Sequence, residues 1–158
     1  MGISGLHQAL RPYLQPVHCS AYRGQRVGCD GYAWLHRGAC GCAAELAAGE
    51  APWAARGFPP PYVDFCLRMV SMLRAAGVVP VVVLDGGSLP AKAATNAERR
   101  ARRREAAERG AALLAAGRAA EAGTLLTQSV AVTPAMVQEL IAHLRWAGCT
   151  RVGASVCP

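Results

Sequence analysis

Acidic residues are scarce in this chain of 158 residues: there are ten, against 17 lysines and arginines, and the formal net charge is +7. Long apolar runs are also missing, because none approaches the roughly 20 residues that a membrane-spanning helix needs. The segment Met1–Leu14 lacks the compact apolar core and cleavage site of a secretory signal. The sequence therefore predicts neither membrane insertion nor secretion, and the positive charge favours a polyanionic partner.

Regular cysteine spacing and a glycine-rich phosphate loop are absent too. The seven cysteines are odd in number, and Cys40 and Cys42 lie too close together for the usual zinc pair. They are predicted to be small buried hydrophobes in a reducing compartment. Because Asp85-Gly86-Gly87 does not match Gly-x-x-x-x-Gly-Lys, an unrelated phosphate-binding α/β protein is disfavoured. The cysteines are Cys19, Cys29, Cys40, Cys42, Cys66, Cys149 and Cys157.

The most informative stretch that is present is an unbroken aliphatic run, Val81–Leu84, in a composition that is 53% hydrophobic. Such a run is typical of a strand buried on both faces of a parallel sheet. Asp85 stands at its carboxyl end, where open α/β sheets bind ligands, and Gly86-Gly87 allows a sharp exit. Asp85 is therefore a candidate for chemistry, although an aspartate that caps the next turn is an equally good interpretation.

A second stretch repeats this pattern earlier in the chain. Arg26–Cys29 is predicted to be a short strand that ends at Asp30, and Gly31 follows. Two parallel strands that each end in a carboxylate place both acids at one edge of the sheet. Hard divalent cations prefer oxygen ligands, so this edge is predicted to suit such a cation.

Apolar residues at helical spacing predict several helices around these strands. The first is Met1–Leu14, packed on the core, and others cover Tyr32–Ala48 and Tyr62–Ala76. A further helix begins at Thr133, with the threonine as its N-cap and a proline after it. A third strand begins within Cys149–Val152. Strands that alternate with helices in this way predict an α/β fold with a parallel sheet and crossover connections.

The stretch Lys92–Gly117 has a different character, because arginines crowd one long helical segment. No apolar stripe occurs before Leu113, so burial is not expected to hold this helix. A solvated face is one interpretation, and a helix that holds phosphates is the other. The second is favoured because the like charges are left largely unpaired, which costs stability unless an anion binds. The arginines are Arg99, Arg100, Arg102, Arg103, Arg104 and Arg109.

Four stretches together resemble the amino-terminal part of the flap endonuclease and exonuclease 1 family of structure-specific 5′ nucleases. They are Met1–Leu6, Tyr22–Ala39, Leu84–Lys92 and Glu98–Arg103. The resemblance covers residues 1–152 and is greatest to exonuclease 1. It implies a PIN-like parallel sheet with flanking helices and a basic helical arch at about residues 89–130. It also implies a nuclear DNA-repair 5′→3′ exonuclease or flap endonuclease.

The same resemblance implies the site. By match, Asp30 and Asp85 are ligands of two Mg²⁺ ions, which clamp the attacking water and the leaving oxygen. Lys92 and Arg99 are the catalytic basic pair that holds the scissile phosphate. Tyr32 can stack on a base, although on its own it would be interpreted as a core aromatic. The implied partners are DNA with 5′ ends, flaps or nicks and DNA-repair proteins, with no membrane. The implied DNA-binding residues are Gly2, Tyr32, His36, Arg100, Arg102 and Arg103.

The resemblance breaks after Val152, where the family continues into a stretch with further carboxylates and this chain has an off-pattern tail, residues 153–158. Of the ten acidic residues, only Asp30 and Asp85 stand at predicted strand ends. Two carboxylates hold one hydrated Mg²⁺ but not a pair of ions. We therefore expect an incomplete domain, truncated before the sheet is complete and inactive alone, in which Val81–Leu84 lacks a neighbour on one side. The alternative is a non-catalytic DNA-binding fragment that uses the basic arch.

Overall fold

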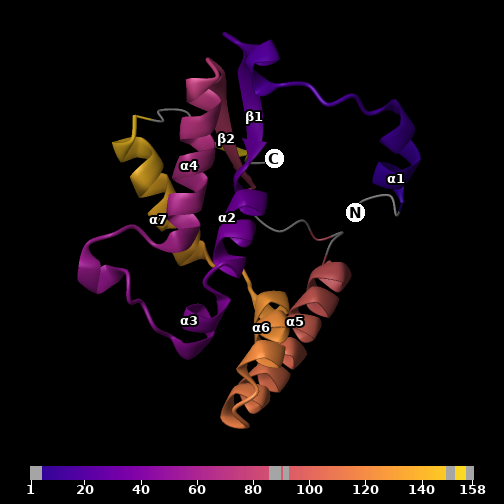
Figure 1. Cartoon of the computed structure of the whole chain (residues 1–158), viewed down its shortest axis with the longest axis vertical. Coiled ribbons are helices and arrows are strands. Elements are labelled where there is room, and N and C mark those ends of the chain that lie inside the picture. The colour runs from indigo at the N-terminus through magenta and orange to yellow at the C-terminus, as the bar shows by residue number, and fades with distance from the viewer. Residues whose placement is uncertain (1–4, 86–89, 91–92, 149–151, 156–158) are drawn as a thin grey trace.

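The computed structural model describes residues 5–85, 90, 93–148 and 152–155. Strands and α-helices alternate, which confirms the predicted α/β class (Figure 1). Three short 3-10 helices lie between them, at Arg11–Tyr13, Cys19–Tyr22 and Ala54–Arg56. The main elements are α1 (Leu6–Leu10), β1 (Arg26–Asp30), α2 (Gly31–Cys40), α3 (Ala43–Ala48), α4 (Pro61–Ala75), β2 (Val79–Asp85), α5 (Ala93–Ala115), α6 (Ala119–Ser129), α7 (Pro134–Trp146) and β3 (Val152–Ser155).

The described strands form one parallel sheet in the order β1-β2-β3. Asp30 at the end of β1 lies opposite Val83, and Asp85 at the end of β2 lies opposite Ser155. The predicted strands ending at Asp30 and Asp85 are therefore confirmed. The expectation that Val81–Leu84 lacks a neighbour on one side is wrong, because the backbone of β3 pairs along it. Residues 153–155, which were expected to belong to an off-pattern tail, are part of β3.

The core lies on one side of the sheet. Val82 and Leu84 are buried in a cluster with residues of α2, α4 and α7. Their neighbours Val79 and Val83 point the other way and are 44% and 36% exposed. The prediction that the β2 run is buried on both faces is thus wrong for the part of the chain that the structure describes, because its helices pack against the Val82 side. Asp30 lies on the exposed side.

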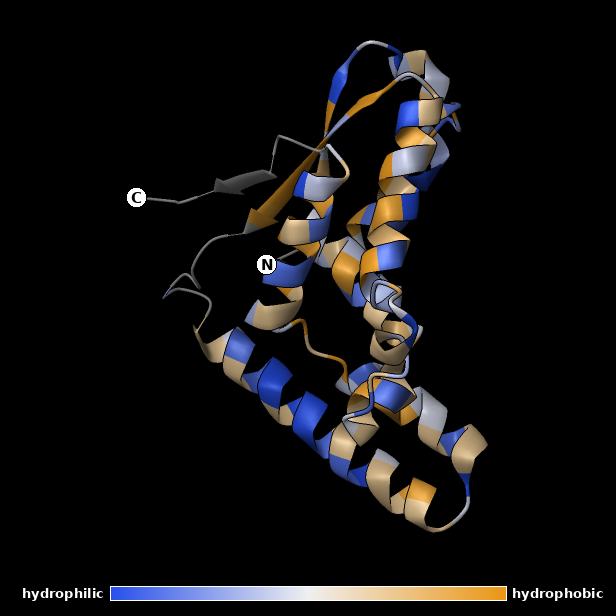
Figure 2. Ribbon diagram, turned by 90° about the vertical axis from the view of Figure 1, so that its left-hand side faces the viewer, coloured by the Kyte–Doolittle hydropathy of each residue, from blue (hydrophilic) through white to orange (hydrophobic). Residues whose placement is uncertain are grey.

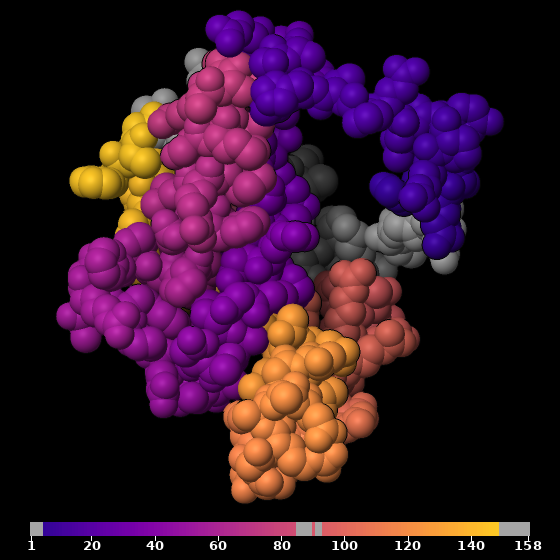
Figure 3. Space-filling view, viewed as in Figure 1, coloured from indigo at the N-terminus to yellow at the C-terminus, as the bar shows by residue number. Residues whose placement is uncertain are grey.

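Two helix predictions also need correction. The stretch predicted as one helix over Tyr32–Ala48 divides into α2 and α3, because Cys42 has non-helical backbone angles (φ −129°, ψ 34°). Among the described residues of the predicted helix over Met1–Leu14, only α1 is α-helical, and its leucines Leu6 and Leu10 are exposed instead of packed on the core. A 3-10 turn that contains Pro12 follows α1 directly, since proline cannot continue the ladder of helical hydrogen bonds. Figures 1 and 3 show α1 standing apart from the main body.

The helices α5 and α6 form a hairpin that projects from the rest of the molecule (Figure 1). Ala106 and Gly110 are buried on α5, and a Cβ atom built on Gly110 would lie 2.8 Å from Cδ2 of Leu126 on α6. Small residues on α5 allow this close approach, so burial helps to hold the basic helix, contrary to the expectation that it does not. Although α5 has 23 residues, neither it nor any other described helix is apolar enough to cross a membrane.

Candidate metal and nucleic-acid site

The carboxyl ends of β1 and β2 bring the two predicted metal ligands together. Asp30 is in register with Val83, and Asp85 lies two residues further along the neighbouring strand. Adjacent strands are ~4.8 Å apart and rise ~3.3 Å per residue, so the two Cα atoms are separated by roughly 8 Å. Residues two apart on a strand share a face, which places both aspartates on the same face of the sheet. A Cα separation of this size is compatible with one cation shared by residues 30 and 85.

Asp30 also caps the helix that follows it. Its Oδ1 accepts a hydrogen bond from the backbone N–H of Ala33 at 3.0 Å, which satisfies one of the free donors at the start of α2. Its other carboxylate oxygen is not used by this cap, and the residue is exposed. Asp30 can therefore cap α2 with one carboxylate oxygen and still offer the other to a cation.

Gly31 makes this arrangement possible, and the only signal for its role in the sequence is the repeated Asp-Gly pattern. A Cβ atom built on Gly31 would lie 2.6 Å from Cδ2 of Leu84 and 2.9 Å from Cγ1 of Val82. A larger residue would push the start of α2 away from β2. Gly31 thereby sets the distance between the end of β1 and the end of β2, and with it the placement of the aspartates.

The donor set fits one partly hydrated Mg²⁺ ion. Carboxylate oxygens are the protein ligands that Mg²⁺ prefers, and it commonly retains several waters. Within the described residues there is no group of three or more His, Cys, Asp and Glu side chains that could hold a metal. Asp30 and Asp85 could therefore hold one ion with water completing its shell. They do not supply the ligands of a two-ion clamp.

The predicted DNA-contacting residues of α2 lie one turn apart on the helix that Asp30 caps. Tyr32 and His36 are both half-buried. Tyr32 packs on the hydrophobic core, so the interpretation as a core aromatic holds for part of its ring. His36 lies beside Cys40, with 3.8 Å between Nδ1 and Sγ. Both residues keep part of their surface exposed on the helix that follows β1.

The first half of α5 carries the densest positive charge of the described chain, and Figure 2 shows this half as the most hydrophilic stretch of ribbon. Of the described ion pairs on α5, one joins Arg104 to Glu108 at 3.8 Å and the other joins Arg109 to Glu105 at 3.7 Å. None includes the four arginines of the preceding turns. The expectation of largely unpaired arginines therefore holds for these four and not for Arg104 and Arg109. The four are Arg99, Arg100, Arg102 and Arg103, and all but the half-buried Arg103 are exposed.

One short connection links the acidic strand end to this basic helix. Seven residues, 86–92, separate Asp85 from Ala93, and an extended chain spans at most ~3.6 Å per residue, so α5 begins within roughly 29 Å of Asp85. The fold therefore brings the ends of β1 and β2 together and tethers the start of the basic helix to the end of β2. Lys92 and Gly2, the remaining predicted site residues, lie outside the described residues.

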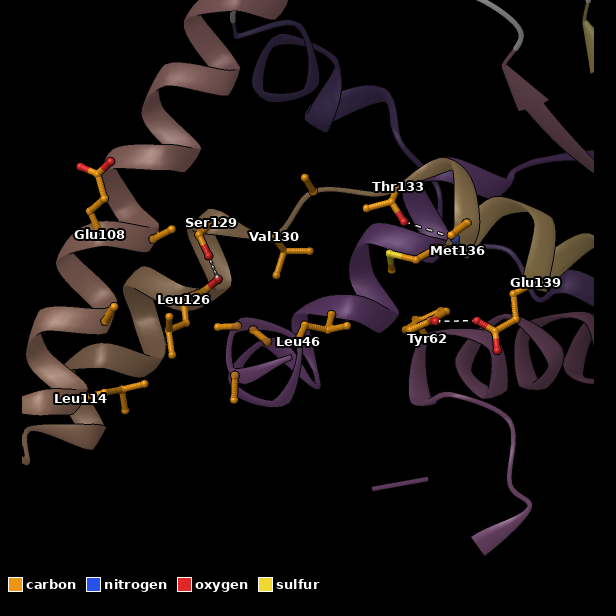
Figure 4. A pocket seen from close by; sticks show the side chains of 17 residues that line it. Leu46, Tyr62, Glu108, Leu114, Leu126, Ser129, Val130, Thr133, Met136 and Glu139 are labelled. Atoms are coloured by element: carbon orange, nitrogen blue, oxygen red, sulfur yellow. Dashed lines mark hydrogen bonds between the residues drawn. The ribbon is translucent and has the colours of Figure 1, made fainter. Parts of the chain in front are cut away.

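A cavity of about 710 Å³ lies at the foot of the hairpin, between α3, α5, α6 and α7 (Figure 4). Its walls are mostly apolar, from residues such as Leu46, Leu126 and Met136. At one end the hydroxyl of Tyr62 donates to Oε2 of Glu139 at 2.7 Å. Burial, together with this bond to a carboxylate, raises the pKa of the Tyr62 phenol. None of the predicted site residues is among the described residues that line this cavity.

Comparison with known proteins matches the chain to one family and to longer relatives. The family model described as the XPG N-terminal domain matches residues 1–106, which include β1, β2 and the basic half of α5. Exonuclease 1 of Danio rerio is 40% identical over 148 residues, covering 94% of this chain and 18% of that protein. Exonuclease 1 of Xenopus laevis is 40% identical over 94% of this chain and 19% of that protein.

A fungal relative is similar to nearly the whole chain as well. Exodeoxyribonuclease 1 of Saccharomyces cerevisiae is 36% identical over 148 residues, which cover 94% of this chain and 20% of that protein. The chain thus spans about a fifth of the length of the curated relatives it matches. The similarity extends through α6 and α7 and is not confined to the family model.

Proposed function

Because the chain belongs to the XPG N-terminal domain family, a family of nucleases, we propose that it forms the amino-terminal part of a nuclear DNA-repair 5′→3′ exonuclease or flap endonuclease. Its substrate is DNA with 5′ ends, flaps or nicks, and its reaction is metal-dependent hydrolysis of a phosphodiester. The observation that carries this proposal is the placement of Asp30 and Asp85 at the carboxyl ends of neighbouring parallel strands.

The residues of the chain take distinct roles in this proposal. Asp30 and Asp85 hold Mg²⁺, which when bound supplies Lewis-acid stabilisation of the phosphodiester. Arg99 presents a planar guanidinium fork that suits two phosphate oxygens, and Lys92 adds a point charge. The exposed part of Tyr32 offers a ring face on which a base stacks, beside His36. The hairpin of α5 and α6 acts as the basic arch, with Arg100, Arg102 and Arg103 along the DNA backbone.

The count of acidic residues predicts that the 158 residues alone cleave DNA at a rate close to background. Only two of the ten carboxylates stand at strand ends, and a two-ion site needs more ligands. The test is incubation of the purified chain with Mg²⁺ and a duplex that carries a recessed 5′ end. Robust turnover that Asp85→Ala abolishes would show that other ligands complete the site.

DNA binding tests the proposed interface independently of cleavage. Fluorescence anisotropy with the same duplex should show affinity that falls steeply with salt. Arg99→Ala and Arg103→Ala should each weaken binding severalfold. Arg68→Ala is the matched control, because Arg68 is exposed on α4 and paired with Asp64 at 3.1 Å. Equal losses in the control and the α5 variants would count against an interface on the hairpin.

A non-catalytic DNA-binding module is the second candidate function, favoured by the four arginines of α5 that lack ion pairs among the described residues. The two candidates differ at Asp30. If the strand ends bind a cation next to the DNA, Mg²⁺ should strengthen binding by the wild type and not by Asp30→Asn. For a binding module alone, Mg²⁺ should affect the two proteins equally.

A further inference from the structure

A second cavity, of about 600 Å³, opens between the loop before α4 and the last turns of α7. Three aromatic side chains line it: Trp53, Phe58 and Trp146. Phe58 is 67% exposed and Trp146 is 90% exposed. Large aromatic side chains left in water at the mouth of a cavity are characteristic of binding surfaces. We call this cavity the aromatic pocket.

The aromatic pocket also contains a carboxylate. Glu139 of α7 is half-buried and lines both this pocket and the first cavity, where its Oε2 accepts from the hydroxyl of Tyr62 at 2.7 Å (Figure 4). Among the described residues, no ion pair joins Glu139 to an arginine, lysine or histidine. A partly desolvated carboxylate without a cation partner is unusual in a chain with a net charge of +7. This charge makes the aromatic pocket complementary to a cation.

His143 adds a further acceptor. It lines the aromatic pocket one turn after Glu139, and its Nδ1 lies 2.9 Å from the backbone carbonyl oxygen of Glu139. A carbonyl oxygen only accepts, so Nδ1 donates in this contact, and in the tautomer with one ring proton Nε2 is left as an acceptor. The aromatic pocket thus combines aromatic faces with acceptors, and no lysine or arginine is among its described lining residues.

We propose that the aromatic pocket binds an arginine side chain of a partner protein. A guanidinium stacks on the faces of tryptophan, and its parallel N–H groups match a carboxylate. A nucleic-acid strand would bring phosphates close to Glu139, which disfavours it. Neither Asp30 nor the α5 arginines are among the described residues that line this cavity. The site is therefore distinct from the proposed DNA interface and goes beyond the proposed function.

The test uses the full chain and a defined probe, the capped tripeptide acetyl-Leu-Arg-Leu-amide. The control peptide has norleucine in place of arginine. Binding is followed by calorimetry and by tryptophan fluorescence. We expect saturable binding of the arginine peptide, weakened about two- to fivefold by Trp146→Ala, the order expected for a lost cation–π contact at an exposed site. Glu139→Gln should weaken the arginine peptide severalfold and leave the norleucine peptide unchanged.

Two control variants distinguish loss of the pocket from loss of the fold. Trp146 is 90% exposed, so its replacement should leave the circular dichroism spectrum and the melting temperature unchanged. Arg145→Ala, a neighbouring exposed residue outside the pocket lining, should bind the peptide like the wild type. Equal affinity for the norleucine peptide, or no saturable binding, would overturn the proposal. Two further results would overturn it, because each assigns the pocket to another occupant. One is that a single-stranded oligonucleotide competes with the peptide in the wild type and does not bind Trp146→Ala. The other is that the chain dimerises through Trp146.

Discussion

At the scale of single residues, Asp30 has two roles, as a helix cap and as a proposed cation ligand, and two substitutions distinguish them. As the N-cap of α2 it accepts from Ala33 N–H, and as the end of β1 it stands next to Asp85. Asp30→Ala should lower the free energy of unfolding by about 1 kcal/mol, whereas Asp30→Asn retains the cap and should cost little. Urea unfolding measures both. Equal destabilisation by the two variants would show that the charge, and not the cap, stabilises this turn.

Gly31 is predicted to be intolerant of even one methyl group. Gly31→Ala would place its Cβ against Leu84 and Val82, and overpacking of this kind costs typically ~1–3 kcal/mol. The matched control is Gly123→Ala in α6, where a Cβ meets nothing within 4 Å. That change should stabilise the helix by roughly 0.5–1 kcal/mol. Thermal unfolding of both variants checks the difference, and a Gly31→Ala protein as stable as the wild type would refute the proposed close approach.

The buried thiol of Cys66 is expected to make the free energy of unfolding depend on pH in the alkaline range. It is buried on α4, and burial raises the pKa of its thiol from 9.0 to about 12. Above about pH 9 the unfolded chain loses this proton while the folded chain keeps it, so the stabilising contribution is complete below pH 9 and declines as pH rises toward 12. The free energy of unfolding should therefore fall less steeply in Cys66→Ala between pH 8 and pH 10.5. Parallel slopes would contradict the assigned pKa.

At the scale of elements, local patterns predicted the parts that are amphipathic and capped. The stripe over Tyr62–Ala76 became α4, and Thr133 caps α7 by accepting from Met136 N–H at 3.3 Å. The break between α2 and α3 has a weak local signal, because Gly41 and Cys42 offer no strong stop. The contact between α5 and α6 was not predicted, for another reason. It uses Ala106 and Gly110, and residues with so little apolar surface leave no stripe in the sequence.

The hairpin contact gives a test at this scale. Gly110→Leu should force α5 away from Leu126 and destabilise the hairpin by an amount near the overpacking range of ~1–3 kcal/mol. Ala112→Leu is the matched control, since Ala112 is exposed on the same helix and leucine is a good helix former. Hydrogen exchange of the α5 and α6 amides reports the difference. Identical protection in the two variants would mean that α5 does not depend on this contact.

At the scale of the whole molecule, topology explains both what could and what could not be predicted. Parallel pairing follows from alternating strands and helices, so the meeting of Asp30 and Asp85 was predictable before any coordinates. Which face of a sheet stays open depends on long-range packing, and no local pattern distinguishes exposed Val83 from buried Val82. The exposure of the α1 leucines has the same origin, because helical spacing shows that a face is apolar but not what it contacts.

The central claim is that the ends of β1 and β2 form one cation site from Asp30 and Asp85. The most direct test is titration of the chain with Mn²⁺, followed by paramagnetic broadening of its amide resonances. We expect broadening centred on Asp30, Gly31 and Asp85, reversed by excess Mg²⁺ and lost in both Asp30→Asn and Asp85→Asn. Broadening centred elsewhere, or unchanged in these two variants, would contradict the claim.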